Sequence, residues 1–197
     1  MAEYLTIAAP AEAQYTDKRS RFLAFALPVR DAAEARAAVA DLQRRYHDAR
    51  HVCWAYMLGS ARTDFLSNDN GEPSGTAGKP ILGQINSLGL TDVLVAVVRY
   101  FGGIKLGTSG LIVAYRTAAR MALEAAPAVV RHDMARITFH FPYAAMNDAM
   151  KLTRDFDVAV VDRKFDNTCR MTLDINADDA PRLRARIDSI DGATIAD

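Results

Sequence analysis

The chain has 197 residues, enough for one large domain or two small ones. Its 24 Lys and Arg residues balance 24 Asp and Glu residues, so bulk charge does not indicate a polycationic nucleic-acid binder, although a local basic patch would fit. No apolar run predicts a membrane span, and the acidic Glu3 and the break at Pro10 are atypical of an export signal. Two distant cysteines, Cys53 and Cys169, predict neither disulfides nor structural zinc, so we expect a cytoplasmic protein without a cofactor.

The first part of the chain predicts three strands and one helix. Mixtures of β-branched, aromatic and apolar residues predict strands at residues 3–8, 21–29 and 52–58. Between the second and third, Asp31 is a predicted helix N-cap, and apolar residues at helical spacing extend the helix to Tyr46.

Two glycine-rich loops follow, and each leads into a predicted helix. Residues 59–77 are rich in Gly, Ser, Asn, Asp and Pro and predict a long loop, and the next segment, GKPILGQINSLG, predicts a short helix with Pro80 in its first turn. The run DVLVAVVRY predicts a buried central strand, and FGGIKLGTSG is the second glycine loop. A helix over LIVAYRTAARMALEAA would turn Arg116, Arg120 and Glu124 outward. We expect six of its residues to face inward: Leu111, Ala114, Tyr115, Ala118, Met121 and Ala122.

A change of pattern near Pro127 predicts two domains, residues 1–128 and 129–197. The second domain has the order β-α-β-β-α-β, ending in a strand at residues 193–197, which predicts a ferredoxin-like fold. Residues 1–128 carry 14 basic and 12 acidic residues, and residues 129–197 carry 10 and 12, so neither domain is a polycation.

The two glycine loops predict an anion-binding surface. A glycine loop that opens a helix presents free N–H groups at the positive end of the helix dipole. Ser74 or Thr76 would cap the first helix, and Thr108 or Ser109 the second. Neither loop has the spacing of a P-loop or of a Rossmann fingerprint, and glycines that merely form tight turns are the alternative. The candidate anion-binding residues are polar residues in or near the loops: Lys79, Arg99, Lys105, Arg116, Ser74, Thr76 and Thr108.

Catalytic and metal-binding patterns are sparse. His51, Asp69, Glu72 and Tyr100 are polar candidates for an acid, a base or a ligand contact, but they form no recognised catalytic constellation. Asp69 and Glu72 alone are a weak metal signal, and Asp69 is more typical of a turn residue that hydrogen-bonds its own backbone. We predict no catalytic residue and no metal site, and we expect Cys53, in an apolar strand, to be a buried thiol.

The loop segments carry a family resemblance. DNGEPSGTAGKPIL and VVRYFGGIKLGTSGLIVAY resemble the two signatures of the YigZ branch of the IMPACT family, and KRSRFLA and ARHVCWAY match as well. The resemblance covers about residues 17–126. It implies a two-domain α+β fold: an N-terminal α/β sandwich like the second domain of ribosomal protein S5, with helices on one face of a sheet, and a C-terminal ferredoxin-like domain like the last domain of elongation factor G.

The resemblance also implies a role in translation. Eukaryotic relatives regulate translation by competing for a partner of the amino-acid-starvation kinase. We therefore expect a non-enzymatic binding module for RNA, the ribosome or a translation factor, and the alternative is a small-molecule or phosphate-ligand enzyme with a site between the loops. The sequence predicts no oligomeric state. Three departures from the signatures, Asn70, Ser109 and Val113, make the predicted surface less charged than is usual in the family.

Overall fold

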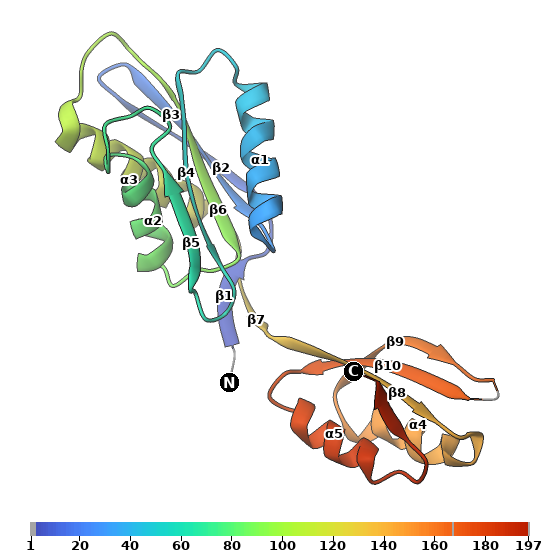
Figure 1. Ribbon diagram of the computed structural model, residues 1–197. Helices are drawn as coiled ribbons and strands as arrows, with labels where there is room; N and C mark the ends of the chain where they lie inside the picture. Colours follow the sequence, from blue (N-terminus) through green and yellow to red (C-terminus); the bar gives the residue numbers. More distant parts are fainter. Residues whose placement is uncertain (1–2, 167, 197) are drawn as a thin grey trace. The chain divides into compact units, whose positions relative to one another are not determined.

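The computed structural model describes residues 3–166 and 168–196. Its contacts form two compact units, one of Tyr4–Arg131 and one of Glu3 together with the described residues from His132 onward. Both units combine helices with antiparallel sheets, so the α+β class is confirmed (Figure 1). None of the helices described is long and apolar enough to cross a membrane.

The first unit is built on a five-stranded sheet in the order β2-β3-β6-β4-β5, in which every neighbouring pair is antiparallel. The near-continuous apolar run of β6 lies at the centre and is buried on both faces, as the sequence predicts. The edge strands β2 and β5 were not predicted. The strands are β2 (Ala11–Asp17), β3 (Ser20–Pro28), β4 (His51–Leu58), β5 (Asp64–Asn68) and β6 (Val93–Tyr100).

Helices cover both faces of this sheet. On one face α1 (Ala32–Arg45) buries Val39 and Leu42 among alternate side chains of β4 and β6. On the other face α2 (Gly78–Ser87) and α3 (Gly107–Ala125) pack against the remaining strand residues (Figure 1). The expectation of helices on one face only is therefore wrong, because each face of the central strands carries apolar side chains that need a cover.

The helix starts are only partly as expected. Asp31 caps α1 as predicted, since its carboxylate accepts a hydrogen bond from Glu34 N at 2.8 Å. The predicted caps of α2 and α3 are wrong, because the first turns of both helices begin without a side-chain cap from Ser74, Thr76, Thr108 or Ser109. Five of the six expected inward residues of α3 are buried. Met121 is the exception, 40% exposed.

The second unit has the predicted ferredoxin-like topology, with an antiparallel sheet in the order β11-β8-β10-β9. Leu152 of α4 and Leu183 and Ile187 of α5 pack with β8 and β10 in one core. The last residue of the predicted final strand, Asp197, lies outside the described residues. The elements are β8 (Met134–Phe141), a short turn of helix η1 (Tyr143–Ala145), α4 (Met146–Asp155), β9 (Val158–Lys164), β10 (Cys169–Asn176), α5 (Ala180–Asp188) and β11 (Thr194–Ala196). In addition β1 (Glu3–Ile7) pairs with β7 (Ala128–His132).

Candidate functional site

The two glycine loops converge on one cavity of about 420 Å³ in the first unit. The first loop contributes Gly71, Glu72 and Pro73, and the second contributes Phe101 and the segment Lys105–Thr108. We call this hollow the loop cavity. Its remaining lining residues come from the start of β4, the end of β6 and α3: Arg50, His51, Arg99 and Leu111.

The N–H groups of the first loop are already occupied by the chain's own Asp69. Its Oδ2 accepts from Gly75 N at 2.8 Å, and its Oδ1 accepts from Ala77 N at 3.0 Å and Gly78 N at 2.8 Å. Burial raises the pKa of Asp69, but these three hydrogen bonds outweigh it and hold the pKa below its ordinary value. The α2 N-terminus therefore already holds an anion, the carboxylate of Asp69. These contacts match the interpretation of Asp69 as a turn residue that hydrogen-bonds nearby backbone.

The same loop is fastened to β4 by short polar contacts. Asn70, at a positive φ of 42°, accepts from Val52 N through its side-chain oxygen at 3.0 Å, and its carbonyl oxygen lies 2.8 Å from His51 Nδ1. A Cβ on Gly78 would lie 2.7 Å from Asn68 N, so only glycine allows α2 to start against β5. Much of the first signature thus fixes the loop to the sheet.

A buried ion pair forms part of the lining of the loop cavity. Arg99 Nη1 donates to Glu72 Oε1 at 2.6 Å, and Tyr115 Oη donates to the same oxygen at 2.8 Å. Arg99 is only 7% exposed, and its Nε has no hydrogen-bond partner among the residues that the structure describes. The guanidinium carbon also lies 5.7 Å from the ring centre of Phe101 at the cavity wall. Arg99 therefore links the two loops.

The thiol of Cys53 completes this buried group. Its Sγ lies 2.9 Å from the carbonyl oxygen of Asp69 and 3.3 Å from Tyr115 Oη. Burial raises the pKa of the Cys53 thiol to about 12, and burial likewise raises the pKa of Tyr115. A thiol held in this protonated form packs and donates a hydrogen bond, but it is a poor nucleophile.

The helix start after the second loop differs from the one after the first loop, where Asp69 accepts the N–H groups. The first turn of α3 has neither an acidic residue nor a side-chain cap, so no side chain among the described residues accepts from its N–H groups. Lys105 and Thr108 are exposed, and Lys105 forms no ion pair or hydrogen bond within 3–166 and 168–196. Arg50, which also lines the cavity, is likewise exposed and unpaired in the same ranges. The exposed part of the cavity lining thus combines two cations, unpaired among the described residues, with the positive end of a 19-residue helix.

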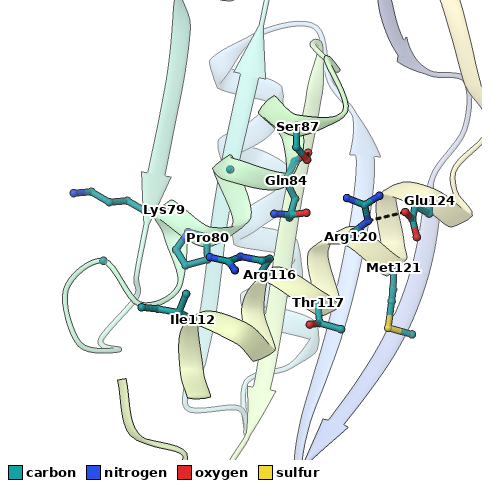
Figure 2. Close-up of a pocket in the computed structure, with 12 residues that line it drawn as sticks. Lys79, Pro80, Gln84, Ser87, Ile112, Arg116, Thr117, Arg120, Met121 and Glu124 are labelled. Atoms are coloured by element: carbon teal, nitrogen blue, oxygen red, sulfur yellow. Dashed lines mark hydrogen bonds and ion pairs between the residues drawn. The ribbon is translucent and has the colours of Figure 1, made fainter. Parts of the chain in front are cut away.

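The other predicted residues lie elsewhere. Lys79 and Arg116 line a different groove, between α2 and α3, where Figure 2 shows them on opposite helices. Tyr100 donates to Asp48 Oδ1 at 2.8 Å and does not line the loop cavity. Thr76 is buried and donates to the carbonyl oxygen of Pro73 at 2.6 Å. Ser74 is exposed.

The four polar candidates do not form one catalytic group. His51 and Glu72 line the loop cavity, but Glu72 is held by Arg99 and Tyr115, and Asp69 and Tyr100 are held by their own partners away from it. In the described part of the chain, no three His, Cys, Asp or Glu residues cluster as metal ligands would.

Three residues of the site were missed by sequence reasoning. Arg50 precedes His51 in the matched segment ARHVCWAY, and Phe101 follows Tyr100 in the second signature, so their places in the motifs were available signals. Tyr115 was predicted only as a core residue, because helical spacing reveals its burial but not its hydroxyl partner.

Known proteins resemble this chain in sequence and fold. The model of the Impact N-terminal domain family matches residues 18–123, which span both loops. An IMPACT family member of Haemophilus influenzae is 32% identical over 179 residues, covering 89% of this chain and 86% of that protein. The chain belongs to the IMPACT family. An IMPACT family member of Thermus thermophilus is 40% identical over 137 residues, covering 70% of this chain and 73% of its own.

The IMPACT family member YigZ of Escherichia coli is 39% identical over 127 residues, 62% of this chain and 61% of that protein. A solved structure described as that of a hypothetical protein aligns with a TM-score of 0.77 at 28% identity, covering 99% of this chain and 97% of the other. The resemblance read from the two signatures is thereby confirmed, and the likeness extends over both units.

Proposed function

We propose that this IMPACT family protein is a non-enzymatic, translation-related binding module of the cytoplasm that holds RNA phosphates at the loop cavity. The observation that carries the proposal is the uncapped N-terminus of α3 beside Lys105 and Arg50, neither of which has a partner among the described residues. Two unpaired cations and free N–H groups at one helix end are the donors that a phosphate needs. Buried free thiols at Cys53 and Cys169 suit a reducing compartment.

An aromatic side chain at the same wall favours RNA over a simple inorganic anion. Phe101 lines the cavity yet is 55% exposed, and the guanidinium of the buried Arg99 makes a cation–π contact with its ring. Exposed aromatic rings beside cations stack the bases of single-stranded nucleic acids, at about 1–3 kcal/mol per base. A backbone phosphate at α3 and a base on Phe101 would use both features.

The enzyme alternative has less support. A general base needs a free acceptor within reach of a substrate, and a nucleophile needs a lowered pKa. Glu72 is tied to Arg99 at 2.6 Å, and the pKa of Cys53 is raised to about 12. His51 lines the cavity, and its Nε2 makes no hydrogen bond with the described residues, but a single histidine defines no reaction.

The test is the salt dependence of RNA affinity. The full chain and a fluorescein-labelled decauridylate are titrated against each other at 25–200 mM KCl, and the logarithm of the binding constant should fall linearly with the logarithm of the salt concentration. Combining Arg50→Ala with Lys105→Ala should reduce the magnitude of that slope by about 1–2 and weaken binding at low salt. Arg184 is an exposed arginine on α5 of the other unit and has no partner among the described residues, so Arg184→Ala is the matched control.

Two outcomes would contradict the proposal. One is an unchanged slope and affinity in the double variant. The other is binding of ribosomes or a translation factor that survives both RNase and high salt, which would point to protein recognition. Arg99→Ala is unsuitable here, because removing Arg99 leaves Glu72 unpaired in the core.

A further inference from the structure

A second hollow lies between α2 and α3, on the face of the sheet that these two helices cover. It is a groove of about 870 Å³, twice the volume of the loop cavity. We call it the α2–α3 groove. Figure 2 shows residues of α2 along one wall and residues of α3 along the other. Its lining is Gly75, Lys79, Pro80, Gly83, Gln84, Ser87, Ile112, Arg116, Thr117, Arg120, Met121 and Glu124.

The groove has an uncompensated positive charge. Lys79, Arg116 and Arg120 line it against a single acid, Glu124, which is bound to Arg120 at 2.7 Å (Figure 2). The sequence of α2 contains no Asp or Glu. Arg116 forms no hydrogen bond or ion pair with any residue that the structure describes, although it lies in the middle of a long helix. A ligand with carboxylates would meet an available guanidinium here.

The side-chain amide of Gln84 lies in the same groove and has no hydrogen-bond partner among the described residues. Gln84 as a whole is only 9% exposed. Its amide atoms are open to solvent at the groove, so they are available to a ligand. Figure 2 shows Gln84 on the α2 wall facing the groove, with Arg116 on the α3 wall. An amide offers both a donor and an acceptor, which is what a peptide backbone or a side-chain carboxylate requires.

The groove is also partly apolar. Pro80, Ile112 and Met121 line it, and Met121 is 40% exposed although helical spacing predicts an inward position. Methionine on a binding surface adapts to different apolar partners. No aromatic residue is among the described residues that line the groove, so the stacking surface that single-stranded nucleic acids use is missing there.

We infer that the α2–α3 groove docks an acidic, amphipathic segment of a partner protein. Carboxylates of the segment pair with Arg116 and Lys79, a polar group of the segment bonds the Gln84 amide, and its apolar side chains cover Met121 and Ile112. An amphipathic helix in a groove between two helices is a common mode of peptide recognition. This site is separate from the loop cavity, so it stands or falls independently of RNA binding.

The test uses two designed peptides and the full chain. The first is a fluorescein-labelled helical 16-mer with leucines on one face and glutamates flanking them, and the second has lysine at every glutamate. Fluorescence anisotropy should show saturable binding of the acidic peptide only. Arg116→Glu should weaken that binding about tenfold or more, because an attraction becomes a repulsion, and Gln84→Leu should weaken it about threefold. Arg184→Glu is the matched charge reversal outside the groove, and circular dichroism checks that each variant is folded.

Each other outcome overturns the inference. Equal binding of the acidic and basic peptides would show adhesion to apolar surface alone. Unchanged affinity in Arg116→Glu and Gln84→Leu would exclude the groove. Loss of peptide binding in Arg50→Ala with Lys105→Ala would move the peptide to the loop cavity. Loss of decauridylate binding in Arg116→Glu, with no peptide binding by the unmodified chain, would assign the groove to RNA.

Discussion

Replacing Glu72 by Gln should destabilise the first unit strongly, because Glu72 is the partner of a buried arginine. The Glu72 and Arg99 side chains are 3% and 8% exposed, and their N–O distance is 2.6 Å. A close pair interacts by about 4 kcal/mol at an effective dielectric constant near 20, and breaking a buried pair costs about 3–5 kcal/mol. Glu72→Gln keeps the shape and one acceptor, so we expect the low end, about 3 kcal/mol.

The measurement is urea unfolding followed by the fluorescence of Trp54, the only tryptophan of the chain, which lies in the core of the first unit. With an m-value of about 1.5–2 kcal/mol/M, the midpoint should fall by about 1.5–2 M. Glu124→Gln, which breaks the exposed pair with Arg120, should lower the free energy of unfolding by only about 0.3–0.5 kcal/mol. Glu72→Gln combined with Arg99→Met should recover part of the loss, since no unpaired charge stays buried. Equal midpoints for Glu72→Gln and Glu124→Gln would refute this reasoning.

Three further predictions concern Asp69, Cys53 and the glycines of the second loop. Asp69→Ala removes the acceptor of three N–H groups and should cost about 2–4 kcal/mol in the same unfolding assay. Folding lowers the pKa of Asp69, so the ionised carboxylate contributes to folding stability above its unfolded pKa of about 3.9, and this contribution is lost as pH falls through the folded pKa. The Asp69→Ala variant should therefore lose less stability on acidification than the unmodified chain. Because burial raises the pKa of Cys53 to about 12, the thiol should resist iodoacetamide at pH 8 in the folded chain and react once urea unfolds it. Mass spectrometry of the peptide that contains Cys53 measures the labelling, and rapid labelling of the folded chain would contradict the burial of the thiol. Gly102→Ala should lower the unfolding midpoint reported by Trp54, because a Cβ at residue 102 would overlap the backbone of Arg19. Gly103 has open space around it but a φ of 88°, so Gly103→Ala should lower the free energy of unfolding by only about 1–2 kcal/mol. A smaller effect at Gly102 than at Gly103 would contradict the clash.

Elements with a strong apolar pattern were predictable. The continuous run of β6 and the helical spacing of α3 determine their burial almost residue by residue, and the β-α-β-β-α-β order of the second unit gave its topology. The edge strands β2 and β5 were missed, because an edge strand half open to water carries polar residues such as those of AEAQYTD and DFLSN.

The chemistry of the loops was less predictable, because its partners are distant along the chain. Glycine spacing suggested two equivalent anion sites, but Asp69 reaches six to nine residues ahead and fills the first. The Glu72–Arg99 pair spans 27 residues, which no local pattern reveals. Met121 lies on the helix face that spacing assigns to the core, yet it lines the groove between α2 and α3 and is 40% exposed.

The difference between the two loops is the central claim, and amide NMR tests it most directly. Titration of the ¹⁵N-labelled chain with decauridylate at low salt should shift the first-turn amides of α3, Gly107 to Ser109, together with Lys105. The amides of Ala77 and Gly78 should stay in place, because Asp69 already binds them at 3.0 Å and 2.8 Å. Shifts at Ala77 and Gly78 without shifts at Gly107 to Ser109 would contradict the account.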